Sequence, residues 1–200
     1  KYNIVIVCPG MGKSVYETSF YPETSYKWNI IPGGKFVGET LLKFLNDNFS
    51  LATKKEGTGI MGVTAGAHGS ILVAAQYSEK FGAAVGISGY YDQTTMQTSR
   101  MVESVYGSYR KNQVRWENDD NVLKLADKLK GVNVYIYDGA RNDAFNPGQS
   151  QLMAIRLKQL KNKDPEYNIT YREGKTGGYG WLYWRAQVEP VMEFMNDTLK

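Results

Sequence analysis

A stretch of small and apolar residues over 59–75 limits what this 200-residue chain can fold into. It opens with a short apolar run and continues through Gly-x-Thr-x-Gly into a helix-favouring run. Gly62 and Gly66 flank Thr64 with the spacing of a strand that turns sharply into a helix and raises the central side chain above a sheet. The stretch predicts a strand over 58–63, a helix over 65–77 and Thr64 at the turn between them.

Predicted strands and helices alternate along the rest of the chain. The first strand is predicted over 2–8, an apolar β-branched run that ends at Pro9-Gly10. Such alternation predicts an α/β fold in one domain over 1–200, with a doubly wound, mostly parallel sheet and helices on both faces. The other predicted elements are strands over 81–88, 132–137 and 167–173, helices over 36–49, 120–130, 147–161 and 182–199, an aromatic loop over 15–33 and a polar excursion over 90–118 with one or two short helices.

The chain contains one cysteine, Cys8, and one histidine, His68. A single cysteine excludes an internal disulfide and a cysteine-built zinc site, and no cluster of carboxylates has metal-ligand spacing. We therefore expect neither a metal nor a cofactor. The single histidine also means that a histidine-dependent mechanism has only one candidate. His68 follows Thr64 by four residues, on a helix that runs away from the turn, so we expect it to be packed or hydrogen-bonded locally.

The charge and the hydropathy of the sequence argue against a nucleic acid partner and against a membrane span. The net charge is +4 without a dense basic patch, which argues against a nucleic acid partner. No apolar run approaches the length of a membrane span. The sequence also argues against a phosphate-binding loop over 10–14, because the glycine that such a loop needs five residues before Gly12 is Val7. The compartment stays open, with a secreted or periplasmic location favoured over a cytoplasmic one.

Several segments, taken together, match one family pattern in order. Residues 7–16 end a strand and continue into Ser-x-Tyr, residues 62–69 form the turn, and residues 77–84 and 88–92 follow it. Residues 139–143 match an acid loop, and residues 177–185 match Gly-Gly-His-x-Trp-x-x-Trp-Arg except at the histidine. The chain thus resembles the branch of the α/β-hydrolases that holds esterase D, feruloyl esterases and mycolyltransferases. The resemblance implies that fold and carboxylic-ester chemistry.

The resemblance also implies site residues. It places the nucleophile at Thr64, the acid at Asp143 and the catalytic histidine at Tyr179, so that only the acid keeps its residue type. The amide of Ala65 falls where the family has one donor of its oxyanion hole. Three aromatic residues are predicted to line the pocket: Tyr16, Tyr91 and Trp181.

Of the three residues at the triad positions, two are unsuited to catalysis: Tyr179 as the base and Thr64 as the nucleophile. The base of a serine triad should titrate near working pH, whereas a tyrosine has a reference pKa of about 10. The methyl group of a threonine hinders attack at a crowded turn. We therefore predict a catalytically degenerate, esterase-like protein with a binding, scaffolding or assembly role. Two alternatives stay open: a weak or atypical carboxylic-ester hydrolase that uses Thr64, and a module that binds a small ester, an acyl group or a glycan.

The family pattern contains one strand that this sequence does not show. That strand would pair beside the elbow strand, and its loop supplies the second oxyanion donor. In the family order it would precede Lys1, so the N-terminal strands of the fold are expected to be absent from the 200 residues. We expect either a missing N-terminal segment or a protein partner to complete the sheet, and the chain alone not to behave as a simple monomer.

Overall fold

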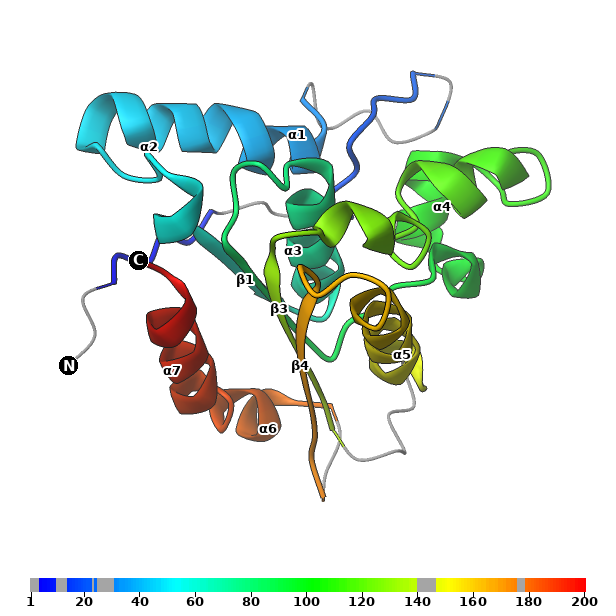
Figure 1. The fold of residues 1–200 in the computed structure, drawn as a ribbon. Coiled ribbons are helices and arrows are strands. Elements are labelled where there is room, and N and C mark those ends of the chain that lie inside the picture. Colours follow the sequence, from blue (N-terminus) through cyan, green and yellow to red (C-terminus); the bar gives the residue numbers. More distant parts are fainter. Residues whose placement is uncertain (1–3, 10–13, 23, 25–30, 140–146, 176–178) are drawn as a thin grey trace.

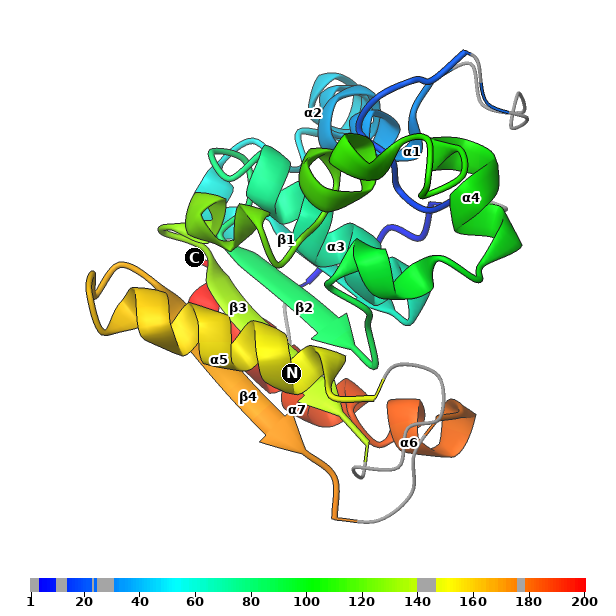
Figure 2. The same cartoon turned by 90° about the vertical axis from the view of Figure 1, so that its right-hand side faces the viewer.

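A four-stranded parallel sheet forms the centre of the computed structural model, which describes residues 4–9, 14–22, 24, 31–139, 147–175 and 179–200 (Figure 2). The strands lie in the order β1-β2-β3-β4. The register pairs Val63 with Ile87 and Ile87 with Tyr137, so the carboxyl ends of the first three strands lie level. The predicted α/β architecture is confirmed. The strands are β1 (Gly59–Val63), β2 (Ala83–Ile87), β3 (Asn133–Asp138) and β4 (Asn168–Glu173).

Helices cover both faces of the sheet (Figure 1). On one face lie α3 (Ala65–Gln76), α5 (Gln149–Lys161) and the short 3-10 helix η5 (Leu125–Leu129), and on the other lies α7 (Val188–Thr198). The side chains of β3 contribute to the cores on both faces of the sheet, because successive side chains of a strand point to opposite faces. Ile136 packs in the core with α3 and α5, whereas Tyr135 packs in a second core with α7.

The remaining helices lie around this framework. The helix predicted over 36–49 is present as two consecutive segments, Phe36–Leu41 and Leu42–Phe49. The excursion over 90–118 contains three helical segments, one α-helix and two short helical turns, where one or two short helices were predicted. Gly38 packs closely on Tyr77, because a methyl group on Gly38 would lie 2.3 Å from that ring. These elements are α1 (Gly33–Lys35), the π-helical η1 (Phe36–Leu41), α2 (Leu42–Phe49), the 3-10 helix η2 (Lys55–Gly57), the 3-10 helix η3 (Gln93–Met96), α4 (Arg100–Tyr106) and the π-helical η4 (Arg115–Asp119).

Two predicted helices differ from the structure. The prediction over 120–130 is wrong, since only the 3-10 helix η5 is helical there and Asp120, at the predicted start, is buried outside that helix. The prediction over 182–199 is divided into α6 (Trp181–Arg185) and α7. The two helices make different contacts. Trp184 of α6 donates a hydrogen bond to Ser88 beyond β2, whereas α7 buries Val191 against the sheet face.

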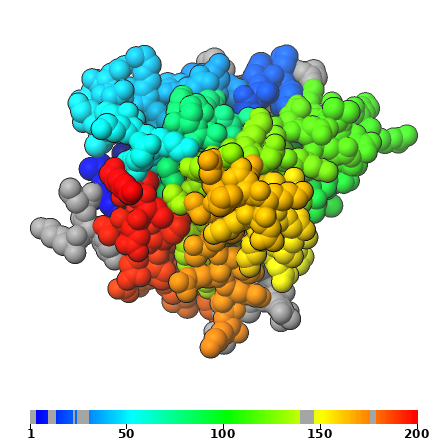
Figure 3. Space-filling view, in the orientation of Figure 1, coloured from blue at the N-terminus to red at the C-terminus, as the bar shows by residue number. Residues whose placement is uncertain are grey.

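The strand predicted over 2–8 is also wrong where the structure describes it. Residues 4–9 form no strand, and Val5 and Ile6 are 65% and 62% exposed. A strand requires hydrogen bonds to a neighbouring strand, and residues 4–9 pair with none of the described strands. Ile4 and Leu199 both pack against the buried cluster on the α7 side of the sheet, and the described segment 4–9 lies near the C-terminal residues (Figure 3). In the described part of the chain β1 is an edge strand, and Met61 on it is 43% exposed.

Candidate functional site

Thr64 links β1 to α3 in a strained backbone conformation. Its φ is 56° and its ψ is −113°. A β-branched residue rarely adopts a positive φ, and holding it there costs about 1–3 kcal/mol. The turn is tight, because a methyl group on Gly62 would lie 2.0 Å from the carbonyl oxygen of Gly66. The Thr64 amide donates to the carbonyl oxygen of Ile87 at 2.9 Å, which ties the turn to β2. The predicted strand–turn–helix at Thr64 is present.

The turn presents a hydroxyl group and a backbone donor at the carboxyl edge of the sheet. The Thr64 carbonyl accepts the amides of Ala67 and His68, at 3.0 and 3.1 Å. The amide of Ala65, at the first position of α3, has no partner within the helix. Thr64 and Ala65 are only half-buried. Amides at a helix N-terminus favour an oxygen that carries partial negative charge, such as that of a carbonyl group.

An aromatic cluster is attached to the same edge. Ser88 follows β2 directly beside Thr64, and its hydroxyl accepts a hydrogen bond from the Trp184 indole nitrogen at 3.3 Å. The Trp184 ring contacts those of Tyr179 and Trp181 edge-on, with centroid separations of 5.0 and 5.4 Å. Trp181 is 79% exposed and Tyr179 is 38% exposed. Tyr179, Trp181 and Trp184, here called the C-terminal aromatic cluster, are therefore held near the elbow and open to solvent.

His68 lies inside the core. Its side chain is fully buried, its Nδ1 lies 3.2 Å from the carbonyl oxygen of Tyr90, and its ring stacks on that of Tyr90. Burial lowers the pKa of His68 from 6.5 to about 4, so the imidazole is neutral at physiological pH. The Nδ1–H group donates to the Tyr90 carbonyl, since a neutral ring must supply its proton to that acceptor. The prediction of a locally hydrogen-bonded histidine is confirmed.

Tyr16 reaches the elbow from the loop before α1. Its φ is 59°, and its ring lies over Gly69, where a methyl group would come within 2.3 Å of it. Its hydroxyl oxygen is 3.9 Å from the position that a Cβ would take on Gly66. The structure therefore brings Tyr16 to the amino end of α3, next to the residues of the turn.

The other predicted site residues fall elsewhere. Tyr91 does not line an open pocket, because it is fully buried and its hydroxyl packs where methyl groups on Gly86 and Gly89 would lie. The paired glycines were a signal for this packing that the sequence analysis missed. Asp143 lies outside the described residues.

A buried polar network was also missed. The Asp120 carboxylate accepts the Thr18 amide at 3.1 Å, the Thr18 hydroxyl, and the Tyr106 hydroxyl at 2.7 Å. Burial raises the pKa of Asp120, and the hydrogen bonds from Thr18 and Tyr106 oppose that shift. The network fixes the loop that carries Tyr16. The sequence offered only consecutive acidic residues, and nothing in it told the buried one from its exposed neighbour.

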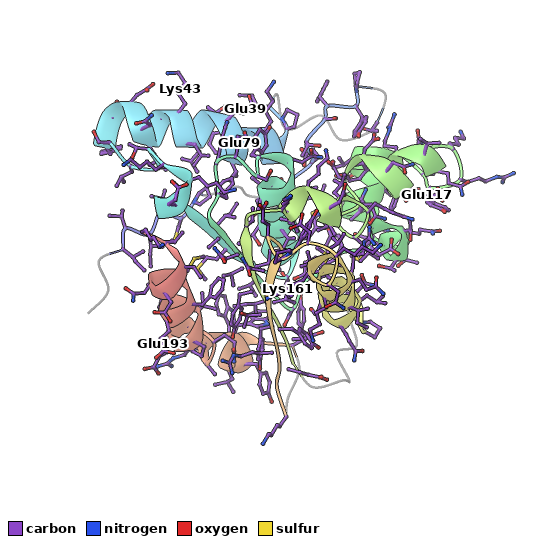
Figure 4. All side chains as sticks on the ribbon, viewed as in Figure 1. Glu39, Lys43, Glu79, Glu117, Lys161 and Glu193 are labelled. Atoms are coloured by element: carbon purple, nitrogen blue, oxygen red, sulfur yellow. The ribbon has the colours of Figure 1, made fainter. Side chains whose placement is uncertain are left out.

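A shallow groove of about 330 Å³ lies far from the elbow. Its lining includes Glu39 of η1, Lys43 of α2 and Glu79 after α3, which are labelled in Figure 4. Lys80 also lines it. These residues precede the amino ends of the strands, whereas Thr64 follows a carboxyl end. Charges of both signs line the groove, so it has no clear preference for a charged ligand.

The described residues offer no metal site, since no three His, Cys, Asp or Glu side chains among them converge on one point. Among those residues, too, no helix combines the length and the apolar character that crossing a membrane requires.

Comparison with known proteins assigns the family. A family model named Esterase, described as "Putative esterase", matches residues 3–194. The chain belongs to the Esterase family. It is 24% identical to an acetyl esterase of Caldicellulosiruptor saccharolyticus over 99% of this chain and 74% of that protein. It is 22% identical to the diacylglycerol acyltransferase/mycolyltransferase Ag85B of Mycobacterium leprae over 97% of this chain and 66% of that protein. The chain thus spans about two thirds to three quarters of these relatives.

Solved structures show the same fold. MPT51 of Mycobacterium tuberculosis superposes with a TM-score of 0.65 at 20% identity, over 96% of this chain and 75% of that chain. An S-formylglutathione hydrolase from Agrobacterium tumefaciens superposes with a TM-score of 0.70 at 15% identity, over 93% of this chain and 63% of that chain. The Esterase protein described here has the α/β-hydrolase fold, and its relatives include ester hydrolases and acyltransferases.

Proposed function

We propose that this Esterase-family protein is catalytically degenerate and binds an acyl or ester group at the elbow instead of cleaving it. The burial of His68, its one histidine, carries the proposal. That imidazole donates to the Tyr90 carbonyl and is kept neutral inside the core, so it is not available to take a proton from Thr64.

Hydroxyl nucleophiles need such an acceptor. Attack on an ester carbonyl transfers the hydroxyl proton to a base that is within hydrogen-bond reach and titrates near working pH. The family resemblance puts Tyr179 where that base would lie, and a neutral phenol donates protons more readily than it accepts them. The base is therefore missing at both places where the chain could supply an imidazole.

Binding groups remain at the elbow. The Thr64 hydroxyl and the Ala65 amide suit a carbonyl oxygen, and the C-terminal aromatic cluster offers apolar ring faces beside them. Such a combination suits the acyl chain of a small ester, while the exposed rings would also stack on a sugar. We favour the acyl or ester ligand because the hydroxyl and the amide converge at one turn.

Restoring the triad tests the proposal. The double variant Thr64→Ser with Tyr179→His should hydrolyse 4-nitrophenyl butyrate at least about a hundredfold faster than the natural chain, since a positioned base contributes that much or more. Each single variant should gain far less, because nucleophile and base act together. A folded double variant without any gain would contradict the assignment of Thr64 and Tyr179 to the triad positions.

A weak hydrolase is the second candidate function. Thr64 keeps a strained positive φ and is half-buried, and strain of this kind persists at functional sites. Under this alternative, ester hydrolysis would depend on Thr64 but not on His68. A rate lost in Thr64→Ala and kept in His68→Asn would favour it.

A further inference from the structure

The Tyr16 side chain follows the surface of α3 toward the elbow. Its ring occupies the space that a side chain at Gly69 would fill, and its hydroxyl lies 3.9 Å from the Cβ position of Gly66. Gly66 is about one helical turn closer to Thr64 than Gly69 is. The phenol therefore ends beside the first turn of α3, where the Ala65 amide has no helical partner.

The hydroxyl group of Tyr16 is available to a ligand. Two other tyrosines, by contrast, donate to carboxylates: Tyr21 to Asp119 at 2.7 Å and Tyr106 to Asp120 at 2.7 Å. The Tyr16 hydroxyl makes no hydrogen bond to any residue that the structure describes, and the side chain is half-buried. Burial raises the pKa of Tyr16, so the phenol keeps its proton and acts as a donor at physiological pH.

The loop holds this side chain in place. The Tyr16 amide donates to the Ser14 hydroxyl at 2.9 Å, and the carbonyl oxygen of Glu17 accepts the Gly34 amide at 2.8 Å. Thr18 is fixed to the buried Asp120 by its amide and its hydroxyl. Hydrogen bonds on both sides of Tyr16 therefore set its unusual φ before any ligand arrives, and a donor fixed in advance binds an oxygen without a cost of reorganisation.

We propose that the Tyr16 hydroxyl donates a hydrogen bond to the carbonyl oxygen of an acyl or ester group bound at the elbow, alongside the Ala65 amide. A carbonyl oxygen has two lone pairs and accepts two donors. The inference rests on the proposed acyl or ester binding and names the group that recognises the carbonyl. Tyr16 is thus the binding residue that confers a preference for carbonyl compounds over hydrocarbons of the same shape.

The test uses phenyl butyrate labelled with carbon-13 at its carbonyl, added to the full chain. Binding is measured by titration, and the infrared carbonyl stretch reports hydrogen bonding to that oxygen. Tyr16→Phe keeps the ring that packs on Gly69 and removes only the hydroxyl. Tyr21→Phe is the matched control. It removes a tyrosine hydroxyl from the same loop, but that hydroxyl donates to Asp119. Gly69→Ala provides a second variant, since its methyl group would displace the Tyr16 ring.

The natural chain should bind the ester with the carbonyl stretch moved to lower frequency. Tyr16→Phe and Gly69→Ala should bind about three- to tenfold more weakly, as for one lost hydrogen bond, with part of the frequency shift gone. Tyr21→Phe should match the natural chain. Equal affinity and an unchanged spectrum in Tyr16→Phe would overturn the role of Tyr16 while leaving acyl binding intact. Failure of the natural chain to bind the ester would overturn the proposed function and this inference with it.

Discussion

The Nδ1 atom of His68 lies 3.2 Å from the carbonyl oxygen of Tyr90, and the two rings stack with centroids 4.2 Å apart. His68 lies on α3, is fully buried and is the one histidine of the sequence, so this contact holds the only imidazole of the protein inside the core. A base for the elbow must face the carboxyl edge of the sheet, above Thr64. The His68–Tyr90 contact therefore separates the histidine from the hydroxyl that would need it.

The stability of the fold should depend on pH through His68. Burial lowers its folded-state pKa to about 4, whereas the unfolded chain binds the same proton near pH 6.5. Between these values only the unfolded state is protonated, so the free energy of unfolding should fall by up to about 3 kcal/mol as pH decreases from 6.5 to 4. Urea unfolding at pH 7 and pH 4.5 measures this change.

The control for this prediction is His68→Asn, which can still donate to the Tyr90 carbonyl but does not titrate. The raised pKa of Asp120 acts in the opposite direction, stabilising the fold as pH falls, and it is common to both proteins. The difference between the two proteins therefore isolates His68. Identical pH dependence in the two proteins would contradict the buried neutral imidazole.

The two glycines of the elbow should respond oppositely to alanine. A methyl group on Gly62 would lie 2.0 Å from the Gly66 carbonyl oxygen, so Gly62→Ala should destabilise the fold by about 3 kcal/mol or more. A methyl group on Gly66 would meet nothing closer than 3.9 Å, so Gly66→Ala should be neutral or stabilise by up to about 1 kcal/mol. Thermal unfolding of both variants measures these changes in stability. Equal losses of stability in the two variants would argue against a tight turn.

The buried Asp120 should matter far more than its neighbour. Asp120→Ala leaves the Thr18 amide and the Tyr106 hydroxyl without their acceptor and should cost about 2–4 kcal/mol. Asp119→Ala removes an exposed partner of Tyr21 and should cost less than about 1 kcal/mol. The comparison is made by urea unfolding at pH 7. Similar small losses in both variants would mean that the network does not hold the loop.

The outer edge of β1 should make the 200-residue chain associate with itself. Among the described residues β1 is an edge strand, which presents unpaired backbone groups, and it also carries Met61 at 43% exposure. Light scattering after size exclusion should show dimers or larger species that become monomeric in Met61→Lys. Leu152→Lys, at a comparably exposed position on α5, should have no effect. A natural chain that stays monomeric at every concentration would refute this expectation.

The elbow could be predicted because its determinants are local. Gly62 and Gly66 flank Thr64 within five residues, and the required backbone geometry follows from that spacing. The parallel sheet likewise could be predicted from the alternation of strand and helix patterns, since parallel neighbours are joined through helices. These features depend on residues that are close together in the sequence.

What could not be predicted depends on distant partners. The run over 4–8 has strand-forming residues, but whether it becomes a strand depends on a neighbour far away in the sequence. Asp120 is fixed by Thr18, 102 residues earlier, so the residues around it in the sequence indicated only the start of a helix over 120–130. Tyr91 was expected in a pocket, yet it is fully buried, and its amide donates to Gln149, 58 residues later in the sequence.

Hydrolysis of 4-nitrophenyl butyrate by the natural chain and by Thr64→Ala tests catalytic degeneracy most directly. Without a base for the Thr64 hydroxyl, both proteins should show the same slow rate, no greater than that of a folded protein without an ester-cleaving site. Turnover by the natural chain that Thr64→Ala abolishes would contradict the account and establish Thr64 as a working nucleophile.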